Sequence, residues 1–325
     1  MTRAATWLLS VGVLLFIGVL ATQGLLAVMA TLALAGWGLS LVALFHLLPV
    51  ALDAWALRVL FRAAPSSDTL RDALLARWVG ESANSLMPAG QLGGPVVMTR
   101  HLAHRGIPLP DAAAAVTVST TLQIFAQIAF ALAGIVLLGA RATDMSQHPL
   151  RTASLLASAL LAVPVVGFYV LQRCGLFGKI MRTANRFAGK RDWSGLMNQA
   201  EAIDRSVQLI YGRAGPVAAS FLLSLVGWFA GTGEVYLVLL LIHHPVGWVD
   251  ALLLESLGQA IRGAAFAIPG ALGVQEGGYL LLAPLAGLPS EAALALSLAK
   301  RARELLLGLP GLLYLHFASR VLPTP

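Results

Sequence analysis

The chain has 325 residues, of which 58% are hydrophobic and only 11% are charged, and its mean hydropathy is +0.80. Soluble domains carry about 25% charged residues, so this composition excludes a soluble globular protein and predicts one that crosses a membrane several times. The net charge of +7 does not by itself indicate nucleic-acid binding, because the positions of the basic residues decide that. The single cysteine, Cys174, excludes an intramolecular disulfide.

Apolar segments long enough to cross a membrane recur along the chain, since a spanning helix needs about 20 residues. We expect six such helices, over residues 7–23, 36–61, 111–139, 151–171, 214–242 and 290–318. The first segment could instead be a signal peptide, because Arg3 precedes its apolar run. Its length, and the apolar segment that follows at once, favour a retained membrane helix.

Two further segments, about 70–104 and 248–286, are interrupted by proline and glycine and carry polar side chains. Their second arms, near 95–104 and 277–286, hold about ten residues, which as a helix reach about 15 Å, or half of the hydrocarbon core. We therefore predict two re-entrant helical hairpins, each entering and leaving the membrane on the same side.

The two hairpins match each other when the chain is shifted by 181 positions. Pro88 then falls on Pro269 and Gly106 on Gly287, and MPAGQLGGP aligns with IPGALGVQE. A polar, broken segment at the same spacing before the same Gly-x-Pro is better explained by duplication than by chance. We interpret the chain as one membrane domain, 1–325, with a first repeat at 36–139, a connector at 151–213 and a second repeat at 214–320.

The basic residues predict how the repeats are oriented. Residues 172–213 hold eight Lys or Arg against three Asp or Glu, which places this amphipathic connector in the cytoplasm, on anionic headgroups. Counting helices from there places Arg77, residues 100–105 and both chain ends in the cytoplasm, and His243-His244 outside. The hairpins then enter from opposite faces of a bacterial-type inner membrane, as in the inverted-topology repeats of secondary transporters.

The first hairpin carries three candidate substrate-binding residues. Glu81 stands out, because a carboxylate costs a few kcal/mol at membrane depth unless it lies at the interface. Asn84 and Gln91 either contact the substrate or cap the backbone of the turn. The break itself is assigned to Pro88, Gly93 and Gly94, since glycine allows a sharp turn and close approach.

The second hairpin carries four candidate substrate-binding residues. Glu255, Gln259 and Arg262 stand at i, i+4 and i+7 and share one helical face, so they face the bundle interior as a substrate site or as an internal salt bridge. Glu276 begins a half-helix, where a carboxylate binds substrate or caps the helix N-terminus. The break of this hairpin is assigned to Pro269, Gly270 and Gly273.

The last predicted helix carries a cluster of four charged residues near its middle: Lys300, Arg301, Arg303 and Glu304. Counted from Ser290 they lie about 15–20 Å along the helix, near the membrane centre. Three cations against one anion leave positive charge for Glu255, Glu276 or an anionic substrate to neutralise. The alternative is a purely structural ion network, and Asp53 and Glu234 in other helices are further candidate partners.

Other chemistry has no motif in this sequence. The seven histidines lack metal-ligand spacing beside a carboxylate, and no nucleotide-binding glycine fingerprint, Walker lysine, Gly-x-Ser-x-Gly or His-Glu-x-x-His occurs. We therefore expect no cofactor, no metal and no nucleic-acid partner.

The segments GESANSLMPAGQLGGPVV, LESLGQAIRGAAFAIPGALGVQEGGYLLL and LSLAKRAREL resemble the flippase-like proteins related to the transmembrane region of lysylphosphatidylglycerol synthase, and most of all the hopanoid-biosynthesis-associated HpnL branch. Many relatives carry an arginine and an acidic residue in the helix after the first hairpin. Here that stretch, 118–123, is uncharged, so those roles do not transfer. The resemblance implies movement of a lipid between leaflets, with a hopanoid-linked or anionic lipid as substrate and lipid-biosynthesis enzymes as candidate partners.

The sequence thus predicts a lipid transporter rather than an enzyme. Without a nucleotide-binding module, net movement must be downhill or coupled to an ion gradient. The rival hypotheses are a membrane enzyme acting on a lipid or polyprenyl headgroup, with Glu255 or Glu276 as base, and a non-transporting scaffold for hopanoid biosynthesis.

Overall fold

A computed structural model describes residues 29–30, 33–61, 69–87, 93–141, 148–187, 194–265 and 268–321. Every regular element in these ranges is a helix, which confirms the predicted all-α class. The expected first membrane helix at 7–23, and the hairpin residues Pro88 and Gln91, lie outside the described residues.

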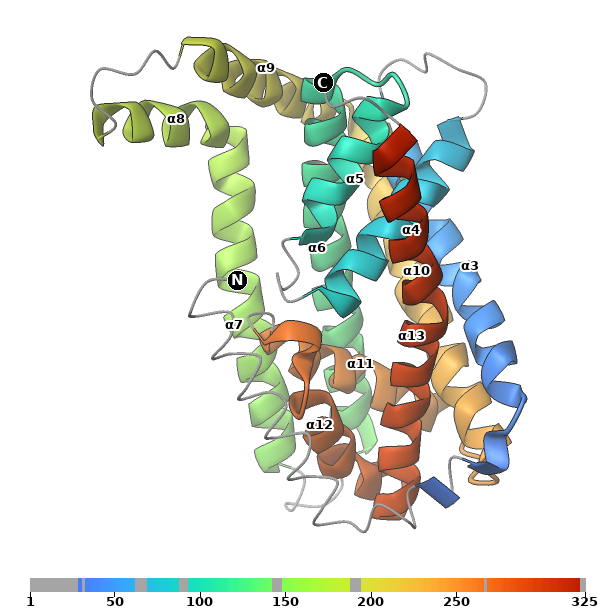
Figure 1. Cartoon of the computed structure of the whole chain (residues 1–325). Helices are drawn as coiled ribbons and strands as arrows, with labels where there is room; N and C mark the ends of the chain where they lie inside the picture. Colours follow the sequence, from blue (N-terminus) through green and yellow to red (C-terminus); the bar gives the residue numbers. More distant parts are fainter. Residues whose placement is uncertain are drawn as a thin grey trace.

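The first unit consists of α3 (Gly38–Arg58), α4 (Thr69–Leu86), α5 (Gly93–His104) and α6 (Leu109–Arg141). The chain then continues through α7 (His148–Arg173), α8 (Leu176–Phe187) and α9 (Ser194–Tyr211). In Figure 1, α8 and α9 lie across one end of the bundle, the end at which α5 finishes. Asp204 of α9 fixes the start of α8 by accepting hydrogen bonds from the Phe177 and Gly178 N–H groups at 3.0 and 2.7 Å.

The second unit consists of α10 (Ala214–Leu241), α11 (Trp248–Ala264), the 3₁₀ turn η3 (Pro269–Ala271), α12 (Val274–Leu282), a second 3₁₀ turn η4 (Ala283–Ala286) and α13 (Ser290–Val321). By length and apolar composition, three of the described helices could cross a membrane: α3, α6 and α10. α13 has 32 residues but carries the charged cluster. The prediction of six membrane-spanning helices stays a prediction.

The boundaries of the elements follow the 181-residue offset. α5 begins at residue 93 and α12 at 274, while α6 begins at 109 and α13 at 290. The two glycines that precede α6 and α13, Gly106 and Gly287, both have positive φ, at 91° and 63°. Figure 1 shows α6 and α13 running in opposite directions. The inverted arrangement of the two units across a membrane remains a prediction.

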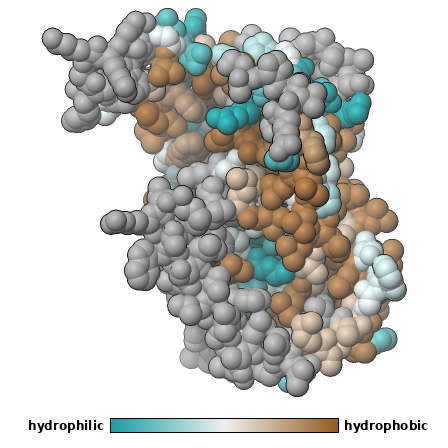
Figure 2. All heavy atoms as spheres, viewed as in Figure 1, coloured by the Kyte–Doolittle hydropathy of each residue, from teal (hydrophilic) through white to brown (hydrophobic). Residues whose placement is uncertain are grey.

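Small residues let the helices pack closely, as is common in membrane bundles. Gly233 of α10 has no room for a Cβ because the Phe45 ring of α3 lies against it, and Gly311 of α13 is closed off in the same way by Ser82 of α4. Figure 2 shows hydrophobic side chains over most of the described part of this face, with a hydrophilic patch in its middle at the height of α11.

Candidate functional site

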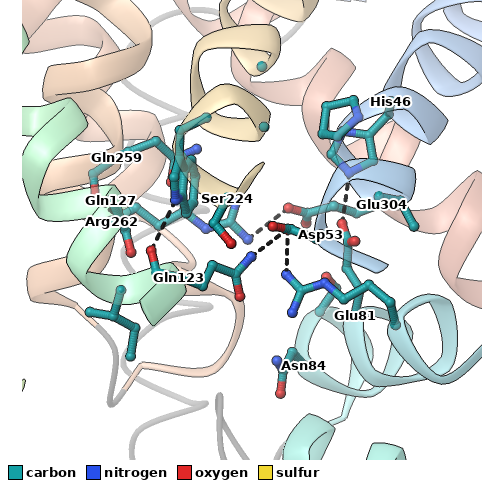
Figure 3. Close-up of a pocket in the computed structure, with 18 of the residues that line it drawn as sticks. His46, Asp53, Glu81, Asn84, Gln123, Gln127, Ser224, Gln259, Arg262 and Glu304 are labelled. Carbon is teal, nitrogen blue, oxygen red and sulfur yellow. Dashed lines mark hydrogen bonds and ion pairs between the residues drawn. The ribbon is translucent and has the colours of Figure 1, made fainter. Parts of the chain in front are cut away.

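A cavity of about 200 Å³ lies where α3, α4, α6, α10, α11 and α13 meet. Figure 3 shows His46, Asp53 and Glu81 facing the same space as Gln127 and Gln259. Both predicted hairpins contribute to it. Its charged or titratable lining residues are His46, Asp53, Arg77, Glu81, Glu234, Glu255, Arg262, Arg303 and Glu304.

Described residues on either side of the first hairpin's break lie close to the cavity, as does the break of the second hairpin. Gly270 has φ of 61° and lines the cavity, and a Cβ there would lie 3.6 Å from the Ser85 carbonyl oxygen of α4. Gly273, with φ of 79°, is the N-cap of α12. In the first hairpin the Gly94 N–H donates to Asn84 Oδ1 at 2.8 Å, so Asn84 caps the backbone while it also lines the cavity.

The predicted stripe on α11 faces the cavity, and two of its members, Glu255 and Arg262, pair with residues of α13. Lys300 Nζ donates to Glu255 Oε2, and both residues are almost fully buried. Gln259 Nε2 donates to Glu255 Oε1 at 2.9 Å, and the Tyr279 hydroxyl donates to Glu255 Oε2 at 3.1 Å. Glu255 therefore accepts three hydrogen bonds within the protein, whereas Lys300 lies behind the cavity wall.

Glu276 acts as a helix cap. Its Oε2 accepts a hydrogen bond from the Gly273 N–H at 2.7 Å, and its Oε1 accepts from Ser297 Oγ and Arg301 Nε, each at 3.1 Å. The side chain is fully buried and does not line the cavity. Of the two roles considered for Glu276, capping of the half-helix is the one that this geometry supports.

Glu304 connects α13 to the second hairpin. Its Oε1 lies 2.9 Å from Arg262 Nη2, and its Oε2 accepts from Arg301 Nη1 at 3.0 Å. Arg262 Nη1 also donates to Gln275 Oε1 at 3.0 Å. Arg262 and Glu304 both line the cavity, whereas Arg301 lies outside its lining.

Arg303 joins three other helices to α13. Its Nε donates to Glu234 Oε1 of α10 at 3.1 Å, and its Nη1 lies 3.4 Å from Glu81 Oε1 of α4. The same Nη1 is 3.1 Å from His46 Nε2 of α3. Lys300, Arg301 and Arg303 are therefore each paired with a carboxylate, and their partners include Glu255, Glu276 and Glu234, which were named as candidates.

A further ion pair closes the first-repeat side of the cavity. Arg77 Nη2 donates to Asp53 Oδ2 at 3.0 Å, and Gln123 Nε2 of α6 donates to the same oxygen. The Arg77 side chain is largely buried and lines the cavity, so it is not a surface charge, and its predicted place on the cytoplasmic side stays a prediction. The arginine is held there because Asp53 would otherwise lie unpaired among apolar helices.

Sequence reasoning missed several polar members of the site, among them His46, Arg77, Gln123 and Gln127. His46 is an isolated polar residue in a long apolar segment, which is the signal that could have identified it. Glu255, Gln259, Arg262, Arg303, Glu304, Glu81 and Asn84 line the cavity as a group. Lys300, Arg301 and Glu276 lie outside the cavity lining. Lys300 and Arg301 bind the lining residues Glu255 and Glu304, and Glu276 binds Arg301.

Residues 5–311 match the protein family described as lysylphosphatidylglycerol synthase TM region. The chain belongs to this family. No curated protein and no solved structure matches it.

The sequence resembled both this family as a whole and its hopanoid-associated HpnL branch, and the match confirms the resemblance to the family as a whole. It identifies the chain as a membrane protein related to lipids, in agreement with its apolar helices. The family match covers both hairpins and the charged cluster of α13, so the cavity lies within the matched region. The closer link to hopanoid biosynthesis does not follow from it.

Proposed function

We propose that the protein binds an amphipathic lipid and moves it between the two leaflets, with the headgroup held in the cavity between the two hairpins. The observation that carries this proposal is the cavity itself. It is polar and charged, and helices from both predicted repeats line it inside an otherwise apolar bundle. Charged residues at membrane depth are costly and mark substrate or ion pathways.

The size of the cavity supports a headgroup rather than a whole lipid. Pockets for complete drug-sized ligands measure about 300–1,000 Å³, whereas this cavity measures about 200 Å³. The acyl chains would therefore remain among the apolar side chains outside. The hydrophilic patch in the middle of an apolar face is where a headgroup could approach sideways from the membrane (Figure 2).

The charges around the cavity favour a neutral or cationic headgroup over an anionic one. Five carboxylates line it, and only three arginines and His46 oppose them. Each of the three arginines already contacts a carboxylate. An anionic headgroup would have to displace one of these carboxylates, so a hopanoid-linked or other lipid with a hydroxyl or amine headgroup is the better candidate.

The enzyme alternative assigns a base to Glu255 or Glu276. Glu276 does not line the cavity, and its carboxylate is occupied by the N-terminus of α12. Glu255 reaches the cavity but accepts hydrogen bonds from Lys300, Gln259 and Tyr279.

An enzyme should turn over a lipid in detergent, whereas a transporter needs two leaflets. A scaffold should tolerate loss of the cavity charges, provided that it folds.

The function can be tested in proteoliposomes with three fluorescent lipids, whose headgroups are phosphatidylethanolamine, phosphatidylglycerol and a quaternary ammonium. Dithionite destroys the label in the outer leaflet, so lipid that moves outward becomes visible as further loss of fluorescence. We expect the ethanolamine and ammonium lipids to move faster than in protein-free vesicles. Faster movement of phosphatidylglycerol would contradict the charge argument, and no movement of any probe would contradict transport.

The proposed inner-membrane topology has its own test. Arg100 near the end of α5 and His243 after α10 are both exposed, and we place them on opposite faces of the membrane, the first cytoplasmic. Cysteines at these positions, in a chain with Cys174→Ser, should react with a membrane-impermeant maleimide from opposite sides. Labelling of both from one side would contradict the inverted repeat.

A further inference from the structure

His46 lies in α3 and lines the cavity, and both of its ring nitrogens contact carboxylates. Nδ1 is 2.8 Å from Glu234 Oε2 of α10, and Nε2 is 2.8 Å from Glu81 Oε1 of α4. Figure 3 shows the contact with Glu81 at the edge of the cavity. This histidine therefore joins the first hairpin to a helix of the second unit.

The two contacts require two protons. An ionised carboxylate only accepts hydrogen bonds, and a neutral imidazole carries one N–H, so it can donate to only one of the two carboxylates. The second 2.8 Å contact needs another hydrogen, on either His46 Nε2 or Glu81 Oε1. The closed cluster therefore holds one proton more than neutral His46 with two ionised glutamates would have.

On the basis of the transport function proposed above, we propose that the proton shared by His46 and Glu81 is the ion that drives lipid movement. The site binds a proton when α4 contacts α3, and it releases the proton to let the first hairpin move. The protein would then be a proton-coupled lipid transporter. Such coupling supplies the ion gradient that a chain without a nucleotide-binding motif needs for net transport.

Release proceeds on the side of Glu81. The Glu81 side chain is 28% exposed, against 2% for Glu234, so the proton leaves from between Nε2 and Glu81 Oε1 to water in the cavity. His46 keeps its Nδ1–H bond to Glu234. Nε2 then accepts a hydrogen bond from Arg303 Nη1, which already lies 3.1 Å away. Glu81 is left facing a nitrogen lone pair, with the longer 3.4 Å contact to Arg303 Nη1 as its remaining attraction, and the contact between α4 and α3 is weakened.

The charges that face His46 come from three other helices. Glu81 belongs to α4, Glu234 to α10 and Arg303 to α13, while the residues of α6 that line the cavity are uncharged. On α3 itself, Asp53 is already paired with Arg77. With the shared proton bound, the cluster of His46, Arg303 and two glutamates is neutral. Without it, the cluster carries one negative charge, which disfavours the closed arrangement inside an apolar bundle.

The variant Glu81→Gln tests the coupling, because an amide N–H can donate permanently to His46 Nε2 in place of the exchangeable proton. Glu201→Gln is the matched control, since Glu201 is an exposed residue of α9 whose ion pair with Arg182 lies outside the cavity. The probe is fluorescent phosphatidylethanolamine in proteoliposomes with an imposed pH gradient. One proton per lipid would shift the ratio of probe between the leaflets by about tenfold per pH unit.

We expect this shift in the wild-type protein and in Glu201→Gln, and its loss in Glu81→Gln. If the wild-type protein moves the probe but distributes it equally under the gradient, proton coupling is wrong while the proposed transport stands. If no probe moves, the proposed transport of that lipid is wrong, and the second measurement below decides about the proton.

The second measurement detects movement of the first hairpin and does not depend on lipid transport. Spin labels at Met87, the exposed end of α4, and at Leu240, exposed on α10, report their separation by pulsed electron paramagnetic resonance in a Cys174→Ser chain. As the pH rises from about 5 to about 9, we expect the distance distribution to shift in the wild-type protein and to stay fixed in Glu81→Gln. A wild-type distribution that does not change with pH would overturn the proton site.

Discussion

Replacing Glu255 with alanine is expected to lower the free energy of unfolding by about 3–5 kcal/mol, since it leaves the charge of a buried lysine without its partner. Lys300 is 1% exposed, and its contacts are Glu255 and the Tyr279 hydroxyl. Buried apolar residues of the second unit surround this lysine, so loss of Glu255 leaves its ammonium group with the Tyr279 hydroxyl as its remaining hydrogen-bond partner. Thermal unfolding in detergent, followed by tryptophan fluorescence, measures the change.

A double variant separates stability from function. Glu255→Leu combined with Lys300→Met removes both charges, and replacing a buried ion pair with apolar residues of similar volume is often neutral or stabilising. We expect this protein to regain most of its stability and yet to move lipid poorly, because Glu255 lines the cavity. Full transport in the double variant would assign the pair to structure alone.

Straightening the second hairpin is expected to abolish transport. In Pro269→Ala with Gly270→Ala, a residue with a free N–H replaces proline, and the left-handed conformation of position 270, with φ of 61°, becomes strained. Both changes favour a continuous helix from α11 into α12. Such a helix would be long enough to cross the membrane and would move Glu276 away from Gly273, whose N–H it caps at 2.7 Å.

The matched control lies in α7, where Pro164 and Gly167 already stand within a continuous helix. Alanine at both positions should leave transport unchanged, because Gly167 has open space around its Cα and no break needs to be preserved. The equivalent change in the first hairpin, at Pro88 and Gly90, should act like the change at Pro269. Full transport with both hairpins straightened would mean that the breaks are incidental.

The positions of the helix breaks in the second hairpin, and of the charged cluster of α13, follow from local signals in the sequence. Proline by itself does not break a helix in this bundle, since Pro49, Pro164 and Pro310 stand within continuous helices. The chain turns where glycine adopts positive φ, as Gly270 and Gly273 do in the second hairpin and Gly106 and Gly287 do before α6 and α13. In the charged cluster of α13, Lys300, Arg303 and Glu304 are all buried, in agreement with their predicted place at the middle of a helix that packs inside the bundle.

The pairing of these residues could not be predicted from the sequence. His46 contacts a glutamate 188 positions away, and Arg303 contacts that same histidine from 257 positions away. Such contacts depend on which helices become neighbours. The burial of Arg77 could not be predicted for the same reason, since it depends on a partner, Asp53, that lies 24 positions away in another helix.

The central claim is that a lipid headgroup occupies the cavity between the hairpins, and site-specific photocrosslinking tests it most directly. A diazirine amino acid close in size to methionine would replace Met98, which is buried and lines the cavity, or Val136, which is 71% exposed on α6. After illumination in native membranes, mass spectrometry identifies the part of the lipid that is attached. The account predicts attachment to the headgroup at position 98 and to an acyl chain at position 136. An acyl-chain adduct at position 98, with headgroup adducts only at position 136, would contradict it.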